Sequence, residues 1–348
     1  MRCGYRFIRN TQAGDYLDDL LVSAVCAILS IRFILHVTGY PTVGGEHLHV
    51  AHLLWGGLLM LVAIALLLSF LSRTTVRLAA IVGGIGFGAF IDEIGKFVTH
   101  DNDYFYEPAA AIMYATCVLF YLTGRLVLSR RDYSATEYLV NALRETEELA
   151  VEDLDLEEHE RAMRHLERSD PLHPLTPALR AIVAGARLSP LRQPGRAMRF
   201  RRWVARMHRR VVGLQVFPTV LILFFVAQLA VKLGYAFTLA FLWGVDERVI
   251  LEGRLMSHLA GRVHDLSFAH TAKIFMGFVE GIFILLGIVR MRRSRVEAFR
   301  LFRTSILVNI FLTQVFVFAG QQFGALTGLL FNLLVLGALN YLIEREGA

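Results

Sequence analysis

The sequence predicts an all-α fold, a polytopic transmembrane helix bundle with about eight spans and a helical cytoplasmic insertion between spans 4 and 5. Its 348 residues are 55% hydrophobic and only 19% charged, whereas soluble chains are roughly a quarter charged. The apolar residues gather in blocks of about 20, the length of helix that crosses a bilayer, and the mean hydropathy is +0.50. These observations exclude a soluble enzyme, a disordered chain and a secreted disulfide scaffold.

The apolar blocks divide the membrane part of the chain into two halves. The expected spans are 20–40, 48–71, 78–99, 107–128, 211–235, 267–290, 304–321 and 323–343. A Gly-Gln-Gln-Phe-Gly sequence at 320–324 predicts a tight turn between the last two spans. The predicted regions are an N-terminal four-helix membrane region at 1–128, an insertion at 129–210 and a C-terminal four-helix membrane region at 211–348.

The arginines predict the orientation of the chain. The loops after the second, fourth and sixth spans are basic, whereas loops 41–47 and 100–106 contain no Lys or Arg. Because Lys and Arg accumulate in cytoplasmic loops, both termini are expected in the cytoplasm. The same rule accounts for the net charge of +6 without nucleic acid. With no organelle signal recognisable, a bacterial plasma (inner) membrane is the expected location.

Two polar segments interrupt the spans. Residues 129–210 are acidic first and basic later, and the leucine spacing in the first part predicts amphipathic helices. The basic run 196–210 predicts a helix lying on anionic lipid, with Phe200, Trp203 and Met207 toward the bilayer. Plain positive-inside anchoring is the alternative. The second segment, 236–266, is expected as an interfacial helix on the outer side.

Glycines in the third span indicate close packing between helices. Gly84 and Gly88 are four residues apart and form a small-xxx-small face. No strand precedes them, so they do not form a dinucleotide-binding loop. Gly56 and Gly57 are expected to supply the opposing surface on the second span.

Charged residues inside the first three spans form the main candidate site. Each costs about 2.5–3.5 kcal/mol to insert and is a functional candidate for that reason. At 1.5 Å per helical residue they lie in one layer, roughly 6–12 Å below the outer surface. The candidates for binding an ion or solute in this layer are Arg32, His36, Asp92, Glu93 and Lys96. Asp92, Lys96 and His100 are expected to share one face of the third span.

The same layer contains residues that suit a divalent metal such as zinc. Imidazole nitrogens and carboxylate oxygens are typical ligands of such ions. The candidate ligands are His47, His49, His52, His100, Asp101 and Asp103. A bound ion would activate water, with Glu93 or Asp92 as the base. The structural alternative is that Arg32 simply pairs with Asp92 or Glu93, as intramembrane charges usually do.

A smaller polar set occupies the C-terminal half. Glu280 falls near the bilayer centre and lies two helical turns from Lys273, while Lys232 and Gln314 belong to neighbouring spans. A buried Lys–Glu or His–Glu pair, the histidine being His270 of the same span, is one account of this set, and a proton or ion relay is the other. Glu280 is therefore a further candidate for binding an ion or solute.

Three functions follow from these patterns. The first is binding or moving a small ion or polar solute. The second is a metal-dependent membrane hydrolase acting on an outer-leaflet or periplasmic substrate. The third is a membrane scaffold, a homo-oligomer or a complex with a cytoplasmic partner, that signals through residues 129–210.

Overall fold

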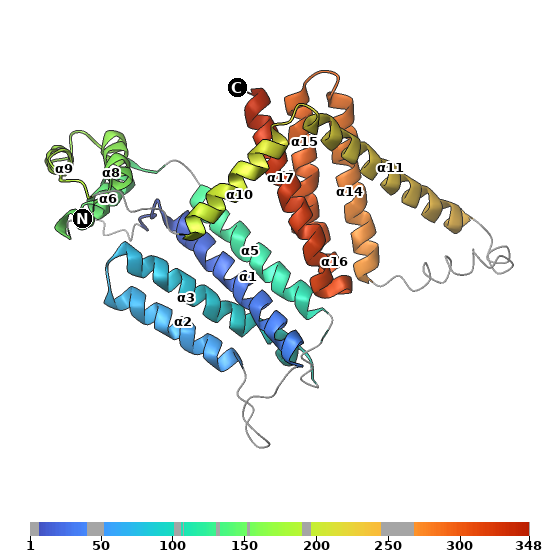
Figure 1. Cartoon of the computed structure of the whole chain (residues 1–348), viewed down its shortest axis with the longest axis horizontal. Helices are drawn as coiled ribbons and strands as arrows, with labels where there is room; N and C mark the ends of the chain where they lie inside the picture. The colour runs from blue at the N-terminus through green and yellow to red at the C-terminus, as the bar shows by residue number, and fades with distance from the viewer. Residues whose placement is uncertain are drawn as a thin grey trace, which may run out of the picture. The chain divides into compact units, whose positions relative to one another are not determined.

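The computed structural model shows a helical protein (Figure 1). Every regular element within the described residues is a helix. The structure describes residues 7–39, 52–100, 106, 108–129, 133–151, 154–189, 196–244 and 268–347. His47, His49, Asp101 and Asp103 lie outside this part of the chain, as does most of the predicted interfacial segment.

Seven helical stretches among the described residues are long and apolar enough to cross a membrane. This finding makes the chain a multi-pass membrane protein in contact with the bilayer. Six of the stretches belong to α1 (Ala13–Thr38), α2 (His52–Ser69), α3 (Arg73–Asp92), α5 (Ala109–Ser129), α11 (Phe217–Gly244) and α14 (Phe268–Arg290).

The seventh stretch, Arg295–Gly347, folds back on itself. It comprises α15 (Arg295–Val308), the π-helical turn η1 (Asn309–Thr313), α16 (Gln314–Gln321), the 3-10 turn η2 (Gln322–Ala325) and α17 (Leu326–Gly347). The reversal begins at Gln322, whose φ of 46° is positive, so the predicted turn at 320–324 is confirmed. Arg295 Nη2 lies 3.5 Å from Glu346 Oε1, and Asn332 Nδ2 lies 2.6 Å from Asn309 Oδ1. These pairs show that α17 runs antiparallel to the α15–α16 leg.

The chain divides into two compact units. The first comprises residues 1–104 and 116–193, and the second comprises residues 105–115 and 194–348. In the first unit, α3 packs against both α1 and α2 (Figure 1).

Glycines permit this close packing in the first unit. A Cβ on Gly84 would lie 2.3 Å from the Leu20 carbonyl oxygen, and one on Gly88 would lie 2.4 Å from that of Ala24. The predicted small-residue face is therefore real, but its partner is α1. Across the other interface a Cβ on Gly56 would meet the Gly86 carbonyl oxygen at 2.7 Å, whereas Gly57 faces open space.

The insertion forms a small helical cluster in the same unit, as the leucine spacing predicts. Its helices are α6 (Ala135–Glu145), α7 (Glu147–Ala150), α8 (Leu156–Arg168) and α9 (Leu175–Ala184). Capping boxes begin α6 at Ser134 and α8 at Asp155, and these satisfy otherwise unbonded backbone N–H groups. The buried core consists of Leu139, Ala142, Ala162, Leu166, Leu179 and Val183.

Two arginines, Arg9 and Arg73, form ion pairs with acidic residues of the insertion. Arg9, before α1, lies 2.8 Å from Glu137 of α6, and Arg73 at the start of α3 lies 2.6 Å from Glu145. The Arg9 guanidinium lowers the pKa of Glu137 to about 2. The chain segments that precede α1 and begin α3 are thereby both fixed to α6.

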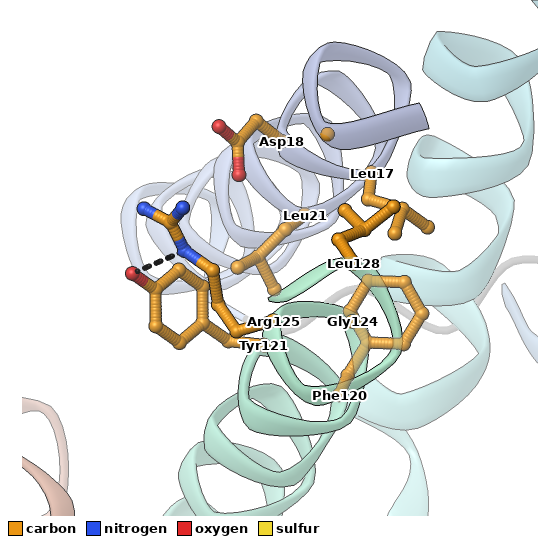
Figure 2. Close-up of a pocket in the computed structure, with 9 residues that line it drawn as sticks. Leu17, Asp18, Leu21, Phe120, Tyr121, Gly124, Arg125 and Leu128 are labelled. Atoms are coloured by element: carbon orange, nitrogen blue, oxygen red, sulfur yellow. Dashed lines mark hydrogen bonds between the residues drawn. The ribbon is translucent and has the colours of Figure 1, made fainter. Parts of the chain in front are cut away.

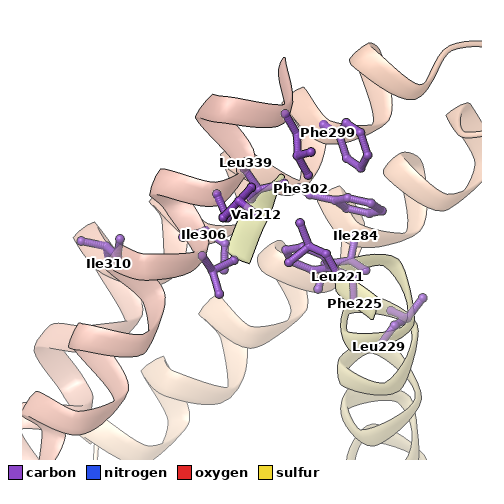
Figure 3. Close-up of a cluster of buried hydrophobic side chains, with 13 residues drawn as sticks. Val212, Leu221, Phe225, Leu229, Ile284, Phe299, Phe302, Ile306, Ile310 and Leu339 are labelled. Atoms are coloured by element: carbon purple, nitrogen blue, oxygen red, sulfur yellow. The ribbon is translucent and has the colours of Figure 1, made fainter. Parts of the chain in front are cut away.

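The second unit has an aromatic core, formed chiefly by α11, α14, α15 and α17 (Figure 3). The rings of Phe225 and Phe302 stack with centroids 4.4 Å apart and an interplanar angle of 12°. The basic run forms α10 (Arg196–Val212), on which Trp203 and Met207 are exposed, as lipid contact requires. The following span begins at Phe217 rather than 211; Pro218 stands in its first turn, where proline costs no helical hydrogen bond.

Candidate functional site

In the charged layer of the first unit each of the two buried carboxylates pairs with a cation, while Glu93 Oε2 accepts no hydrogen bond from the described residues. Asp92 and Glu93 are both fully buried. Arg32 donates from Nε to Asp92 Oδ1 at 2.6 Å and from Nη2 to the Asp92 carbonyl at 2.9 Å. Lys96 donates to Glu93 Oε1 at 3.1 Å, and His52 Nδ1 lies 3.7 Å from the same oxygen. The structural alternative, in which Arg32 pairs with Asp92, agrees with this geometry.

The third span is interrupted at these carboxylates. Helix α3 ends at Asp92, and Glu93, with φ −89° and ψ 9°, separates it from the short helix α4 (Ile94–Val98). The expected common face of Asp92, Lys96 and His100 is therefore absent, because the helix does not continue. Lys96 instead pairs with Glu93, and His100 lies beyond α4 and is exposed.

Two other candidate residues of this layer are His36 and His100. His36 is exposed, and within the described residues neither it nor His100 forms an ion pair or hydrogen bond with the buried carboxylates. His52 alone among the described histidines reaches the layer. No group of three or more His, Cys, Asp or Glu residues in the described part of the chain is arranged to hold a metal ion. The metal site therefore stays a prediction that depends on residues outside this part.

A second buried carboxylate lies in the C-terminal unit. Glu280 is 1% exposed and lies roughly 18 Å along α14 from Phe268 and 15 Å from Arg290 at 1.5 Å per residue. Its Oε2 accepts a hydrogen bond from Lys232 of α11. Its Oε1 accepts hydrogen bonds from Asn309 Nδ2, at 3.0 Å, and from the Thr313 hydroxyl.

The π-helical turn η1 brings the two neutral donors to Glu280. A π-helix bonds each residue to the fifth one along, is rare, and frequently occurs at functional sites. Asn309 and Thr313 are four residues apart, so they lie on nearly the same face of the helix and both reach Glu280. Asn332 of α17 in turn donates to Asn309 Oδ1 at 2.6 Å. One hydrogen-bonded chain thus links α11, α14, η1 and α17 through Glu280.

A cavity of about 480 Å³ opens beside Glu280. In Figure 1, α11 diverges from α14 toward its C-terminal end, and both helices line the cavity together with η1 and α16. Ligand pockets typically measure roughly 300–1,000 Å³, so this volume suits a small molecule. The lining residues are Gln228, Val231, Lys232, Tyr235, Lys273, Ile274, Gly277, Phe278, Glu280, Asn309, Thr313 and Val317.

Comparison with known proteins adds nothing to this geometry. No protein-family model, no curated protein and no solved structure matches the chain. The site must therefore be interpreted from its own residues.

Two further observations define the cavity. The Gln228 side-chain oxygen is buried and has no hydrogen-bond partner among the described residues. Lys273 lines the cavity and is exposed, and it has no carboxylate within ion-pair distance in the described part of the chain. Among the described residues, the cavity therefore offers an acceptor with no hydrogen-bond donor and a cation with no carboxylate partner.

A second pocket, in the first unit, is much smaller. It measures about 40 Å³ and lies between α1 and α5 (Figure 2). Arg125 donates to the Tyr121 hydroxyl at 3.1 Å on one side of it, and Asp18 lies opposite. A water molecule needs roughly 10–15 Å³ of such space, so this pocket has room for a few waters but not for a solute.

The sequence identifies Glu280, Lys232 and Lys273 as candidates, but the helical spacing suggests a different ion pair from the one in the structure. The partner of Glu280 is Lys232 on another helix, not Lys273 two turns away on its own. Asn309 and Thr313 were missed because neutral polar residues in a span carry no charge signal. Their spacing of four residues in an apolar span was the available clue.

Proposed function

We propose that the protein binds a small polar solute or ion in the cavity beside Glu280, as a step in moving it across the membrane. The observation that supports this proposal best is the position of a buried carboxylate in the wall of a cavity midway along a spanning helix. Ionisable groups at such depth are costly and typically serve a substrate or ion pathway. By the positive-inside rule, the insertion and both termini belong on the cytoplasmic side.

The hydrogen-bonded chain supports movement as well as binding. Glu280 joins α11 to η1 through Lys232 on one side and Asn309 and Thr313 on the other. An occupant that competes for any of these groups would change the link between α11 and the other helices. Binding and helix position are thereby coupled, which transport requires.

The charged layer of the first unit is less suited to this role. Arg32 and Lys96 already neutralise Asp92 and Glu93 at hydrogen-bond distance. We infer that this layer holds α1 against the end of α3. A metal-dependent hydrolase and a signalling scaffold remain the alternative functions, and no geometry among the described residues favours either.

The test is a substitution that fills part of the cavity with an apolar side chain and leaves its charged residues unchanged. A Cβ on Gly277, which lines the cavity, would meet nothing within 4 Å, so Gly277→Leu places a side chain in free space. Gly234 also faces open space but does not line the cavity, which makes Gly234→Leu the matched control. The protein would be reconstituted in liposomes and challenged with sodium acetate, choline chloride and glycine while membrane current and uptake are recorded.

We expect at least one of these solutes to produce a current or uptake signal with the parent protein and with Gly234→Leu. Gly277→Leu should reduce it at least tenfold, since the solute and the leucine compete for one volume. A response to none of the probes, or the same response with Gly277→Leu, would overturn the proposal.

A further inference from the structure

We propose that the cavity takes a small organic carboxylate with an apolar body, and that Glu280 takes up a proton when this anion binds. This inference rests on the proposed function, since it names the class of solute for the same cavity. It follows from the charges of the lining, the bonding of Glu280 and the character of the walls.

The charges of the lining favour an anion. Among the described residues, the cavity lining contains two lysines, Lys232 and Lys273, and a single carboxylate, Glu280. Both oxygens of that carboxylate already accept hydrogen bonds, three in all. A cation would have to compete with Lys232, Asn309 and Thr313 for Glu280. An anion, in contrast, finds Lys273 with no carboxylate partner among the described residues. Carboxylates form strong, charge-assisted hydrogen bonds with lysine.

The apolar walls restrict the rest of the solute. Most of the lining side chains that are not charged are aliphatic or aromatic. Burial of apolar solute surface against them contributes about 25 cal/mol per Å². The solute class is therefore a carboxylate on a short aliphatic or aromatic body. The apolar lining residues are Val231, Tyr235, Ile274, Phe278 and Val317.

Proton uptake by Glu280 follows from the pairing of Lys232. While Glu280 is ionised, Lys232 is committed to it and also approaches the Gly277 carbonyl at 3.4 Å. An incoming carboxylate that Lys273 attracts to this cavity would place a second negative charge close to that of Glu280. Like charges that share a site disfavour ionisation, so a proton moves from water to Glu280 and Lys232 turns to the anion. No bond of the solute breaks, and the cavity gains one anion and one proton.

The other groups that face Glu280 do not supply this proton. From α11 they are Lys232 and Tyr235, from α14 Lys273, and from η1 the neutral side chains Asn309 and Thr313. Neither the amide of Asn309 nor the hydroxyl of Thr313 is an acid that could release a proton, so the proton comes from water. The unpartnered Gln228 oxygen lines the same cavity and offers an acceptor for a protonated carboxyl group or for water.

The test uses three probes of one shape and three charges: benzoate, benzamide and benzamidinium. Binding of each radiolabelled probe to the full-length protein in nanodiscs would be measured at pH 5.5 and 7.5, with protein-free nanodiscs as the blank. We expect benzoate to bind at least tenfold more tightly than either other probe. Its affinity should rise by up to tenfold for each pH unit lowered, because one proton is bound with it.

Variants separate the parts of the proposal. Lys273→Gln should weaken benzoate binding about tenfold, whereas Arg292→Gln, which removes an exposed positive charge of the same unit away from the cavity lining, should not. Glu280→Gln should remove the pH dependence of benzoate binding, since a neutral group is already present. Benzoate affinity that is equal at both pH values in the parent protein would overturn the proton uptake.

The outcomes also distinguish this inference from the proposed function. Preferential binding of benzamidinium that Gly277→Leu abolishes would overturn the anion class and leave the cavity as a solute site. Absence of benzoate binding together with a Gly277-dependent response to choline or glycine would do the same. Benzoate binding that Gly277→Leu leaves unchanged would place the anion elsewhere and overturn the inference.

Discussion

The two units bury carboxylates in different surroundings. In the first unit, Asp92 and Glu93 lie where α3 is interrupted, and Arg32 and Lys96 neutralise them. In the second unit, Glu280 lies within a continuous helix, is paired to another span and forms part of the wall of a 480 Å³ cavity. In the sequence, both sets of charged residues are ionisable side chains within membrane spans, and nothing distinguishes one set from the other.

The packing around each layer explains the difference. In the first unit, glycines bring α3 so close to α1 that an added Cβ would overlap the backbone. In the second unit, aromatic side chains fill one part of the bundle, and α11 diverges from α14 where the cavity lies (Figures 1 and 3). Burial of a charge therefore does not by itself identify a binding site. Free volume beside the charge is the additional requirement.

The largest expected effect tests the glycine packing of the first unit. Gly88→Val should prevent correct packing of α1 on α3, since a Cβ at that position lies 2.4 Å from the Ala24 carbonyl oxygen. Overpacking typically costs about 1–3 kcal/mol, and a larger loss is expected here because the added carbon overlaps with backbone, which cannot move aside as a side chain can. The yield of monodisperse protein on size exclusion would measure it. Gly57→Val is the control, because Gly57 faces open space; equal yields from both variants would contradict the close approach.

The next prediction tests whether the Arg32–Asp92 pair is structural. Asp92→Asn should destabilise the protein by about 3–5 kcal/mol, because it leaves Arg32 without its buried counter-charge. The double variant Arg32→Leu/Asp92→Leu should recover most of that loss, since apolar replacements of a buried pair are often neutral. Unfolding by denaturant with tryptophan fluorescence would compare the three proteins. A double variant less stable than Asp92→Asn would show that the layer is more than a structural pair.

The corresponding substitution in the second unit should reduce the free energy of unfolding by less than Asp92→Asn does. Glu280→Gln keeps a side chain of the same shape, and water in the cavity can solvate the released Lys232. We expect a loss of about 1–3 kcal/mol, the range for disturbing a partly solvated hydrogen bond. The same denaturant series would give the value. A loss as large as that of Asp92→Asn would remove the contrast between the two layers.

The sequence predicts the membrane class of the chain and much of its local structure. Long apolar blocks need only length and composition to be recognised, and the reversal at Gln322 follows a run of turn-forming residues. The partners of the charges were harder to predict. Lys232 and Glu280 are 48 residues apart, so no helical periodicity connects them. The interruption of α3 at Glu93 lies beside a tertiary contact, the hydrogen bonds of Arg32 to the Asp92 side chain and carbonyl, which a regular helical pattern does not contain.

The cavity was beyond sequence reasoning for a related reason. Free volume depends on how far α11 diverges from α14, and no residue pattern along either helix reports that distance. The glycine face, in contrast, was predictable because small side chains four residues apart lie on one side of a helix. Its partner helix was not, since Gly84 and Gly88 face α1 rather than α2.

The smallest expected effect concerns a third buried polar group, His165 of the insertion. Burial lowers the pKa of His165, helped by Arg161 and Arg164 and opposed by Glu145. The unfolded chain therefore binds a proton at His165 below about pH 6.5 more readily than the folded one. Folding stability at this position is full above that pH and declines as the pH falls, by at most about 1.4 kcal/mol per unit.

His165→Phe should reduce this decline, because phenylalanine fills a similar volume and does not titrate. Hydrogen-exchange protection of α8, corrected for intrinsic rates at pH 7.5 and 5.5, would measure it in the full-length protein. The insertion lies outside the spans, so its stability should change with pH while that of α3, packed through glycines, stays constant. Equal pH dependence of protection in the parent protein and in His165→Phe would assign the titration to another group.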